Sequence, residues 1–243
     1  MPAGFPRMGS AVIDRSCCVC GQDEFVHSDV LWPELVSAWE LSKDEWRYID
    51  IQQGTHCVAC RANVRSIALA RAIMRARGFT GTLTGFVADR AQAALRVLEI
   101  NEAGGLHPIL AQLPGHRLIS HPEYDMTALP FPAGSFDLVV HSDTLEHVAN
   151  PRKGLQECLR ILAHDGALAF TVPVIVGRLS RDRASLPPSY HGQEGSVDPG
   201  MLVHTEFGAD VWTYVLGVGF SSCELVPVAY PAGLAIIAKA TTH

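Results

Sequence analysis

Long apolar segments are missing from this chain of 243 residues. No run of about 18 apolar residues, the length needed to cross a bilayer as a helix, is free of a charge, a proline or a glycine cluster. The N-terminus also lacks an apolar core between basic residues and a small-residue cleavage site, which predicts a cytoplasmic protein without membrane contact. Since 48% of the residues are hydrophobic, the composition excludes a mainly disordered chain and predicts one or two globular domains.

An excess of positive charge is missing as well. The 19 lysines and arginines are outnumbered by 25 acidic residues, which gives a formal net charge of −6. Proteins that hold nucleic acid along a broad face usually carry the opposite balance. The charge therefore argues against a nucleic-acid partner, although it is compatible with a local basic patch.

Cysteine, by contrast, is concentrated at one end, with five of the seven in the first sixty residues. Cys17 with Cys20 and Cys57 with Cys60 form two Cys-x-x-Cys pairs. Each pair can fill two corners of a tetrahedron around zinc, so together they predict a closed structural site. Two disulfides, which need an oxidising compartment, and redox-active thiols are the alternatives. Cys18 is a bystander unless it replaces Cys17.

Helical signals follow the first cysteine pair. Pro33 begins a short helix, Ser42 to Glu45 form a capping box for a second, and a third helix runs from after Cys60 to about Arg77. Four arginines share one side of this third helix: Arg61, Arg65, Arg71 and Arg75. Such a face can meet phosphate or an acidic substrate, but we interpret it as solvated. We predict that residues 1–78 form a helical zinc-binding domain.

From residue 79 onwards, short apolar runs alternate with helical segments. Strands are predicted at 95–100, 116–120, 136–140 and 167–172. Strands that alternate with helices predict an α/β fold with a doubly wound, mainly parallel sheet. The segments 223–228 and 234–238 are joined by five residues, too few for a crossover helix, so we expect an antiparallel hairpin there.

The motifs between residues 94 and 240 resemble those of class I S-adenosylmethionine-dependent methyltransferases of the type 11 group. The most specific are LPFPAGSFDLVV at 129–140, SDTLEHV at 142–148 and DGALAFTVP at 165–173, in this order. The resemblance implies a Rossmann-like methyltransferase domain over residues 79–243, closed by an antiparallel C-terminal hairpin, and S-adenosylmethionine as the cofactor.

The resemblance also implies where the cofactor binds. The first glycine-rich turn of the family corresponds to the sequence EINEAGG at residues 99–105, where Asn101 and Ala103 replace two glycines. Asparagine tolerates the left-handed conformation that such a turn needs. After the second strand the family's next helix and third strand are deleted or reduced. The implied cofactor-binding residues are Glu99, Asn101, Ala103, Gly104, Gly105, His121, Glu123, Asp125, Met126, His141 and Ser142.

A long loop follows the strand predicted at 167–172, and we expect residues 177–207 to form a lid without regular structure over the acceptor. The loop leaves the sheet at the carboxyl ends of the strands, where ligands bind in open α/β sheets. Histidine suits a base near neutral pH, so the catalytic candidates are His191, His204 and Tyr190, with His141 in reserve. For each candidate a packing role is the alternative. His147 matches a family position that shapes the crevice.

Together these observations predict a methyltransferase that acts on a small-molecule metabolite or natural product and carries a structural Zn²⁺ ion. One alternative is a methyltransferase for rRNA or tRNA bases, which the arginines favour and the net charge does not. The other is a decayed methyltransferase-like module that binds a ligand without catalysis.

Overall fold

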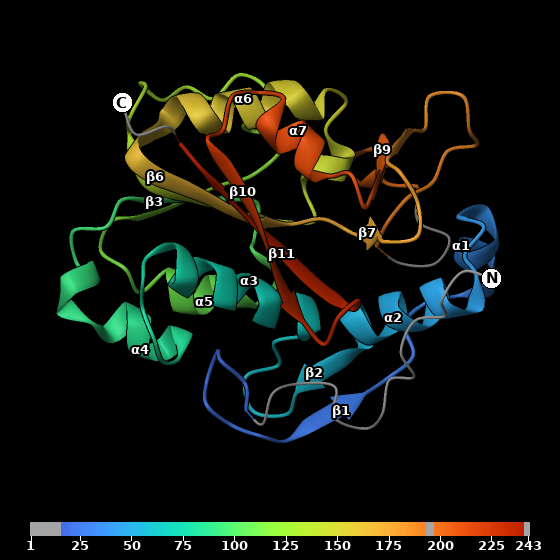
Figure 1. Cartoon of the computed structure of the whole chain (residues 1–243), viewed down its shortest axis with the longest axis horizontal. Helices are drawn as coiled ribbons and strands as arrows, with labels where there is room; N and C mark the ends of the chain where they lie inside the picture. Colours follow the sequence, from blue (N-terminus) through green and yellow to red (C-terminus); the bar gives the residue numbers. More distant parts are fainter. Residues whose placement is uncertain (1–15, 193–196, 241–243) are drawn as a thin grey trace.

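A six-stranded sheet forms the centre of the computed structural model, which describes residues 16–192 and 197–240 (Figure 1). The strand order is β10–β11–β6–β5–β3–β4. The parallel strands are β3 (Val97–Ile100), β4 (His116–Ile119), β5 (Phe136–Ser142) and β6 (Leu162–Thr171). The antiparallel hairpin consists of β10 (Ser222–Val228) and β11 (Gly233–Lys239), and β11 also pairs antiparallel with β6. This topology confirms the predicted α/β fold, with a mainly parallel sheet closed by an antiparallel C-terminal hairpin.

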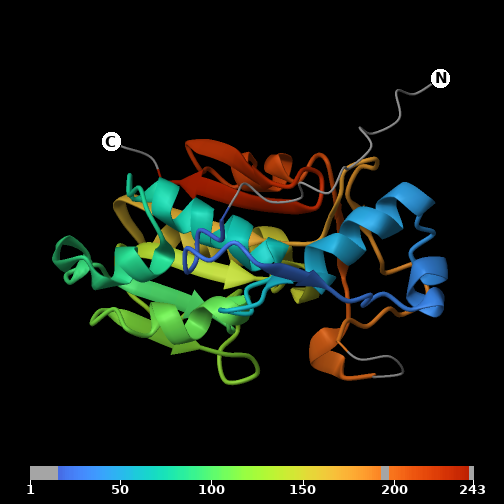
Figure 2. The ribbon, with the colours of Figure 1, turned by 90° about the horizontal axis from the view of Figure 1, so that it is seen from below.

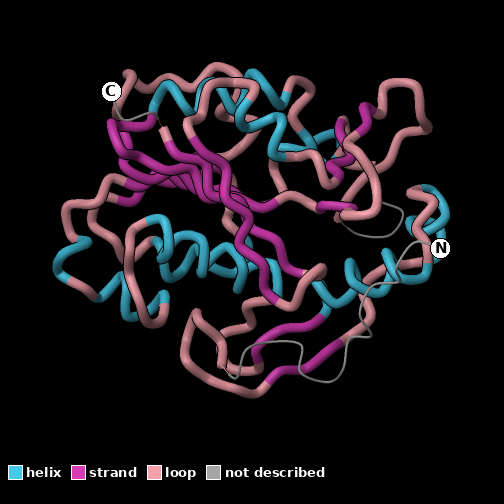
Figure 3. The backbone as a smooth tube through the Cα atoms, in the orientation of Figure 1, coloured by secondary structure: helices cyan, strands magenta, loops and turns pink. Residues whose placement is uncertain are grey.

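Helices cover both faces of the sheet (Figure 3). On one face lie α6 (Pro151–Ile161) and α7 (Trp212–Leu216). On the other lie α3 (Val64–Ala76), α4 (Leu83–Ala88) and α5 (His107–Leu110). Successive residues of a strand point to opposite faces, so Val97 belongs to the core under α3 while Leu98 belongs to the core under α6. Continuous apolar strands therefore reflect burial on both sides.

The sheet ends at β4, which is an edge strand. Residues 120–135, which connect β4 to β5, contain turns and no strand in the described chain. This agrees with the interpretation that a helix and a strand of the family are reduced here.

The N-terminal segment continues into the same core. The strands β1 (Phe25–His27) and β2 (Thr55–Cys57) pair antiparallel, and the helices α1 (Pro33–Ala38) and α2 (Lys43–Gly54) lie between them in the chain. The capping box predicted at Ser42 is present. Cys17 and α3 belong to one hydrophobic cluster with β3, β5, β6 and β11. A domain boundary at residue 78 remains a prediction. Helix α3, which precedes this boundary, packs directly on the sheet that follows it.

One correction concerns the arginines of α3, which we interpreted as a solvated face. Arg65 has a side chain only 13% exposed and forms an ion pair with Asp143. Arg75 is exposed and pairs with Glu224 at 2.5 Å. The prediction for Arg65 was wrong because residues of the loop after β5 cover this end of the helix.

The long loop contains regular structure, contrary to expectation. The strands β7 (Val174–Ile175), β8 (Arg181–Asp182) and β9 (Thr205–Gly208) form a small sheet in the order β7–β9–β8. A backbone bridge between Tyr190 and Leu202 closes a second turn of the loop. Figure 2 shows this orange segment at the same end of the molecule as α1 and α2.

In the described part of the chain, no helix has the length and hydropathy needed to cross a membrane.

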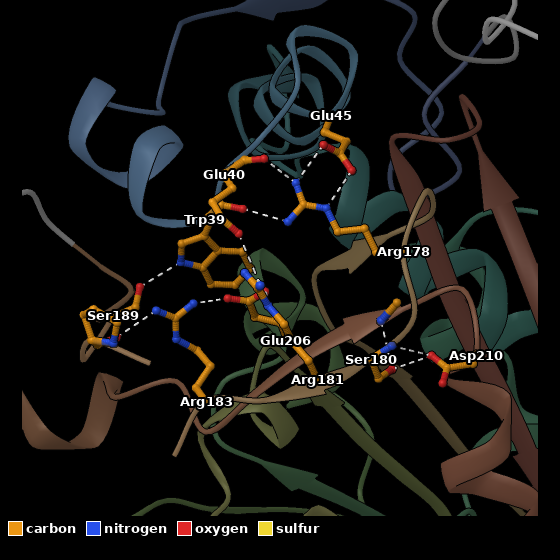
Figure 4. A network of polar contacts seen from close by, with 12 residues as sticks. Trp39, Glu40, Glu45, Arg178, Ser180, Arg181, Arg183, Ser189, Glu206 and Asp210 are labelled. Atoms are coloured by element: carbon orange, nitrogen blue, oxygen red, sulfur yellow. Dashed lines mark hydrogen bonds and ion pairs between the residues drawn. The ribbon is translucent and has the colours of Figure 1, made fainter. Parts of the chain in front are cut away.

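A network of charged groups ties the loop to the N-terminal helices (Figure 4). Arg178 binds both carboxylate oxygens of Glu45, at 3.0 and 2.9 Å, and donates to the carbonyl of Trp39 at 2.8 Å. The indole of Trp39 donates to the hydroxyl of Ser189 at 2.7 Å. Arg181 and Arg183 both pair with the buried Glu206 within the loop. The arginines of the loop therefore hold the lid in place.

Replacing Glu45 by glutamine tests this network. We expect a loss of about 1–3 kcal/mol in the free energy of unfolding, because Arg178 loses its charged partner in a half-buried position. Burial opposes ionisation of Glu45, but the bonds from Arg178 and Ser42 outweigh burial and lower its pKa. Its contribution to stability is therefore complete above the unfolded-state pKa, about 4.3, and is lost as the pH falls through the lower folded-state pKa. Thermal melts between acid and neutral pH measure both effects, and the exposed Glu34 supplies the control Glu34→Gln.

Candidate active site and metal centre

The four paired cysteines converge at the N-terminal end of α3. The Sγ atoms of Cys17 and Cys60 are 3.6 Å apart, as are those of Cys20 and Cys57, and all four lie within 4.8 Å of one another. A tetrahedral zinc ion with Zn–S bonds of about 2.3 Å separates its sulfur ligands by roughly 3.8 Å, so the four thiols fit this geometry. Cys18 lies outside the cluster and donates to the carbonyl of Ile67.

Both cysteine pairs are shaped by similar backbone turns. Gly21 follows the first pair with φ +88° and donates to the carbonyl of Cys17 at 2.7 Å. Arg61 follows the second pair with φ +63° and donates to the carbonyl of Cys57 at 2.9 Å. These left-handed residues turn the chain so that both thiols of a pair face the same point.

The turn after β3 has the conformation that the altered glycine motif predicts. Asn101 and Gly104 have φ values of +54° and +58°. The carboxylate of Glu99 is fully buried and accepts from the backbone N–H of Ala103 at 2.7 Å. It also contacts His107 Nδ1 at 2.8 Å and His116 Nε2 at 2.6 Å, two histidines that the sequence analysis missed. Glu99 thus fixes the turn from within.

The side chain of Asn101 links the ends of three strands. Its amide oxygen accepts from the backbone N–H of His121, and its Nδ2 donates to Thr144 Oγ1 at 3.3 Å. Gly104 lies under α3, since a Cβ added there would be 2.7 Å from Ser66 Oγ. The turn, the start of α3 and the end of β5 therefore meet at one edge of the sheet.

The other residues implied in cofactor binding lie in different surroundings. His121, Glu123, Asp125 and Gly105 are exposed, and Asp125 accepts from the backbone and hydroxyl of Thr127, which lower its pKa. Ser142 shares a hydrogen bond with Thr171 at 2.8 Å. Met126 and His141 are buried. Burial lowers the pKa of His141 to about 4, so its ring is neutral. The ring of His141 stacks on Phe170. Their roles towards a cofactor remain predictions.

A cavity of about 410 Å³ opens next to the end of β5. One wall is apolar and comes from the segment between the cysteine pairs, with Trp32, Leu35 and Trp39. The opposite wall is polar and holds Arg65, Asp143, His147 and His191. Of the three catalytic candidates, His191 lines this cavity, whereas Tyr190 and His204 are not among its lining residues.

Arg65 and Asp143 form the ion pair at the floor of the cavity, and the sequence analysis named neither as a site residue. Burial lowers the pKa of Arg65 to about 10, which leaves it charged at neutral pH. Nε of Arg65 and Oδ1 of Asp143 are buried and have no hydrogen-bonding partner within residues 16–192 and 197–240. Asp143 follows β5 directly with φ +43°. The pair thus presents one unused donor and one unused acceptor.

Comparisons with known proteins agree with the fold. Residues 78–170 match the family model described as "Methyltransferase domain". A demethylmenaquinone methyltransferase of Clavibacter sepedonicus is 36% identical over 98 residues, which cover 39% of this chain and 40% of that protein. The chain thus matches less than half the length of this curated relative.

Solved structures of similar arrangement were also found. One is a possible histamine N-methyltransferase from Thermotoga maritima, 16% identical, covering 73% of this chain and 98% of that one with a TM-score of 0.39. Another is the [4+2]-cyclase SpnF, 13% identical, covering 72% of this chain and 93% of that one with a TM-score of 0.41.

Proposed function

We propose, on the premise that residues 78–170 belong to the methyltransferase domain family, that the chain transfers a methyl group from S-adenosylmethionine to a small molecule. The observation that carries this proposal is the cavity at the end of β5, where an ion pair with unused atoms lies opposite an apolar wall. Ligands of open α/β sheets bind at this edge.

The residues at this edge fit the cofactor. S-adenosylmethionine ends in an amino acid, whose carboxylate suits the free Nε of Arg65 and whose ammonium suits the free Oδ1 of Asp143. The turn from Asn101 to Gly105 and the exposed Glu123 and Asp125 would hold the rest of the molecule, as the resemblance implies. When bound, the cofactor supplies a methyl group on a sulfonium, which an acceptor atom displaces in line. The protein contributes mainly proximity and alignment.

The size and lining of the cavity favour a small acceptor with an apolar body. A volume of about 410 Å³ lies in the range typical of small-molecule sites. Two indole rings, of Trp32 and Trp39, would pack against a flat ring, and the curated relative is named for such an acceptor, demethylmenaquinone. The hypothesis of an RNA substrate loses support because Arg65 and Arg75 of the arginine face already pair with acidic residues.

The cofactor-binding pair can be tested without knowing the acceptor. We expect Arg65→Ala and Asp143→Asn each to weaken binding of S-adenosylmethionine about ten- to hundredfold, the loss typical of one hydrogen bond to a charged group. Isothermal titration calorimetry measures this, with Arg75→Ala at the far end of α3 as the matched control. Wild-type affinity in folded Arg65→Ala would place the amino-acid end elsewhere.

The same titrations test Asp125, which the resemblance implies as the residue that faces the adenine of the cofactor. We expect Asp125→Ala to cost about 1–3 kcal/mol of binding free energy, because the variant loses its hydrogen bond to adenine. Unchanged affinity in Asp125→Ala would move that contact to another residue of the edge.

For the four cysteines we propose one structural zinc ion. The four cysteines would fill all four ligand positions with thiolates, so the ion would have no open position for a substrate. Its part in the function is to hold the segment that forms the apolar wall of the cavity.

A further inference from the structure

His147 and His191 of the polar wall form a second cluster of possible metal ligands with the buried Glu146. Glu146 Oε1 lies 3.6 Å from His191 Nδ1 and 3.8 Å from His147 Nε2. Hydrogen bonds between such groups are about 2.7–3.2 Å long, so these separations are too large for direct bonding. Ligands that share one ion through bonds of about 2.0–2.2 Å lie roughly 3–3.5 Å apart, within a few tenths of an ångström of what is observed.

The carboxylate of Glu146 has no hydrogen-bonding partner although it is buried. Its side chain is 1% exposed, and neither oxygen is hydrogen-bonded to any described residue. A charged group in this position is costly unless a cation compensates it.

The ring of His147 is oriented as a metal ligand would be. Its Nδ1 lies 3.0 Å from the carbonyl of Leu202, which can only accept, so Nδ1 carries the proton and Nε2 faces Glu146 with a free lone pair. A histidine that binds metal usually donates its other N–H to a carbonyl in this way.

His191 completes the cluster from the lid. Its backbone N–H donates to the carbonyl of Met201, and its ring packs between Trp39 at 5.3 Å and the edge of His147 at 5.0 Å. The side chain is therefore held in place before any ion binds.

Two other clusters of acidic and histidine residues differ from this one because their carboxylates have direct hydrogen-bonding partners. Glu99 is in direct hydrogen-bonding contact with His107 and His116, at 2.8 and 2.6 Å. Asp50 accepts from two backbone N–H groups and lies 3.1 Å from His27. Their polar atoms satisfy one another, whereas those around Glu146 do not.

We infer that Glu146, His147 and His191 bind a divalent transition-metal ion such as Zn²⁺. Two imidazoles and one carboxylate form a ligand set that suits Zn²⁺, Fe²⁺ and Co²⁺ and leaves further positions open. Both histidines line the cavity, so the open positions face the place of the acceptor. A hydroxyl oxygen bound to the ion would release its proton to water more readily. Only this last consequence rests on the proposed function.

Binding of Co²⁺ to the full chain tests the inference. The protein is first loaded with one equivalent of Zn²⁺ at the four cysteines and then titrated with Co²⁺. We expect one further equivalent to bind, with visible absorption but without the thiolate-to-cobalt charge-transfer band that exchange into the cysteine site would give. Glu146→Gln and His191→Ala should each weaken this second binding at least tenfold, while His107→Ala in the Glu99 cluster leaves it unchanged.

Each variant is checked for its zinc content and melting temperature, and His191→Ala removes a ligand from the lid rather than from the core. The inference is overturned if the wild type takes up no second equivalent. It is equally overturned if folded His191→Ala retains wild-type Co²⁺ affinity, or if His107→Ala loses it. Since the readout is metal binding, failure to bind S-adenosylmethionine would count against the proposed function alone.

Discussion

Cys57→Ser should release the structural metal ion and unfold or loosen residues 16–77. Structural zinc sites contribute their binding free energy to folding, with apparent values of about 10–16 kcal/mol in small zinc-binding peptides. Whole domains are stable by about 5–15 kcal/mol, so losing one of four thiolates is a large change. The effect should extend into α3, which begins at Val64 and shares a hydrophobic cluster with Cys17. Elemental analysis and hydrogen exchange over residues 16–77 measure the two consequences.

The adjacent thiol provides the matched control for this experiment. Cys18 is next to a proposed ligand but donates to the carbonyl of Ile67 instead of joining the cluster. Cys18→Ser should therefore keep the metal and the protection of α3. A wild-type protein that is well folded and free of metal would contradict the zinc proposal.

His191→Ala should abolish most of the methyl transfer while leaving the affinity for S-adenosylmethionine unchanged. The ring lies at the polar wall of the cavity and faces Glu146, and it is separate from the Arg65–Asp143 pair that would hold the cofactor. Loss of a group that helps to remove a proton from the acceptor typically costs about 10²–10⁴-fold in turnover. If the acceptor has no proton to lose, the variant should instead lose acceptor affinity at nearly constant turnover.

His204→Ala separates the two histidines that the sequence proposed together. The backbone N–H of His204 donates to the carbonyl of Glu146, but the residue is not part of the cavity lining, so its alanine variant should behave like the wild type. Steady-state kinetics with an identified acceptor and calorimetry with the cofactor give both quantities. Wild-type kinetics in His191→Ala would exclude the lid as the wall of the active site.

Local patterns in the sequence were sufficient for much of the fold. The run at 136–140 predicted a buried strand because both faces of β5 are covered, and five linking residues required the hairpin of β10 and β11 to be antiparallel. The capping box at Ser42 and the cysteine spacing are equally local signals. Each depends on residues that are neighbours in the chain, or on spacings that geometry restricts.

The polar wall of the cavity could not be predicted in this way. Arg65 and Asp143 are 78 positions apart, and the helical periodicity of α3 placed all its arginines in solvent. Whether Glu146 is paired depends on how the lid folds over it, since His191 is 45 positions further along. The lid itself uses strands of two to four residues, which are too short to show an alternating pattern.

The chain between the two cysteine pairs is anchored at both ends by the cysteine cluster. The residues that would contact the acceptor therefore lie in a different segment from those that would bind the cofactor. Residues 30–41 supply the apolar wall, while the ion pair and the Glu146 cluster come from other segments. Exchanging this stretch as a cassette should therefore alter which acceptor is chosen without altering the methyl donor. Because the indole of Trp39 donates a hydrogen bond to Ser189 of the lid, an exchanged stretch without Trp39 needs a matching change at position 189 to remain docked.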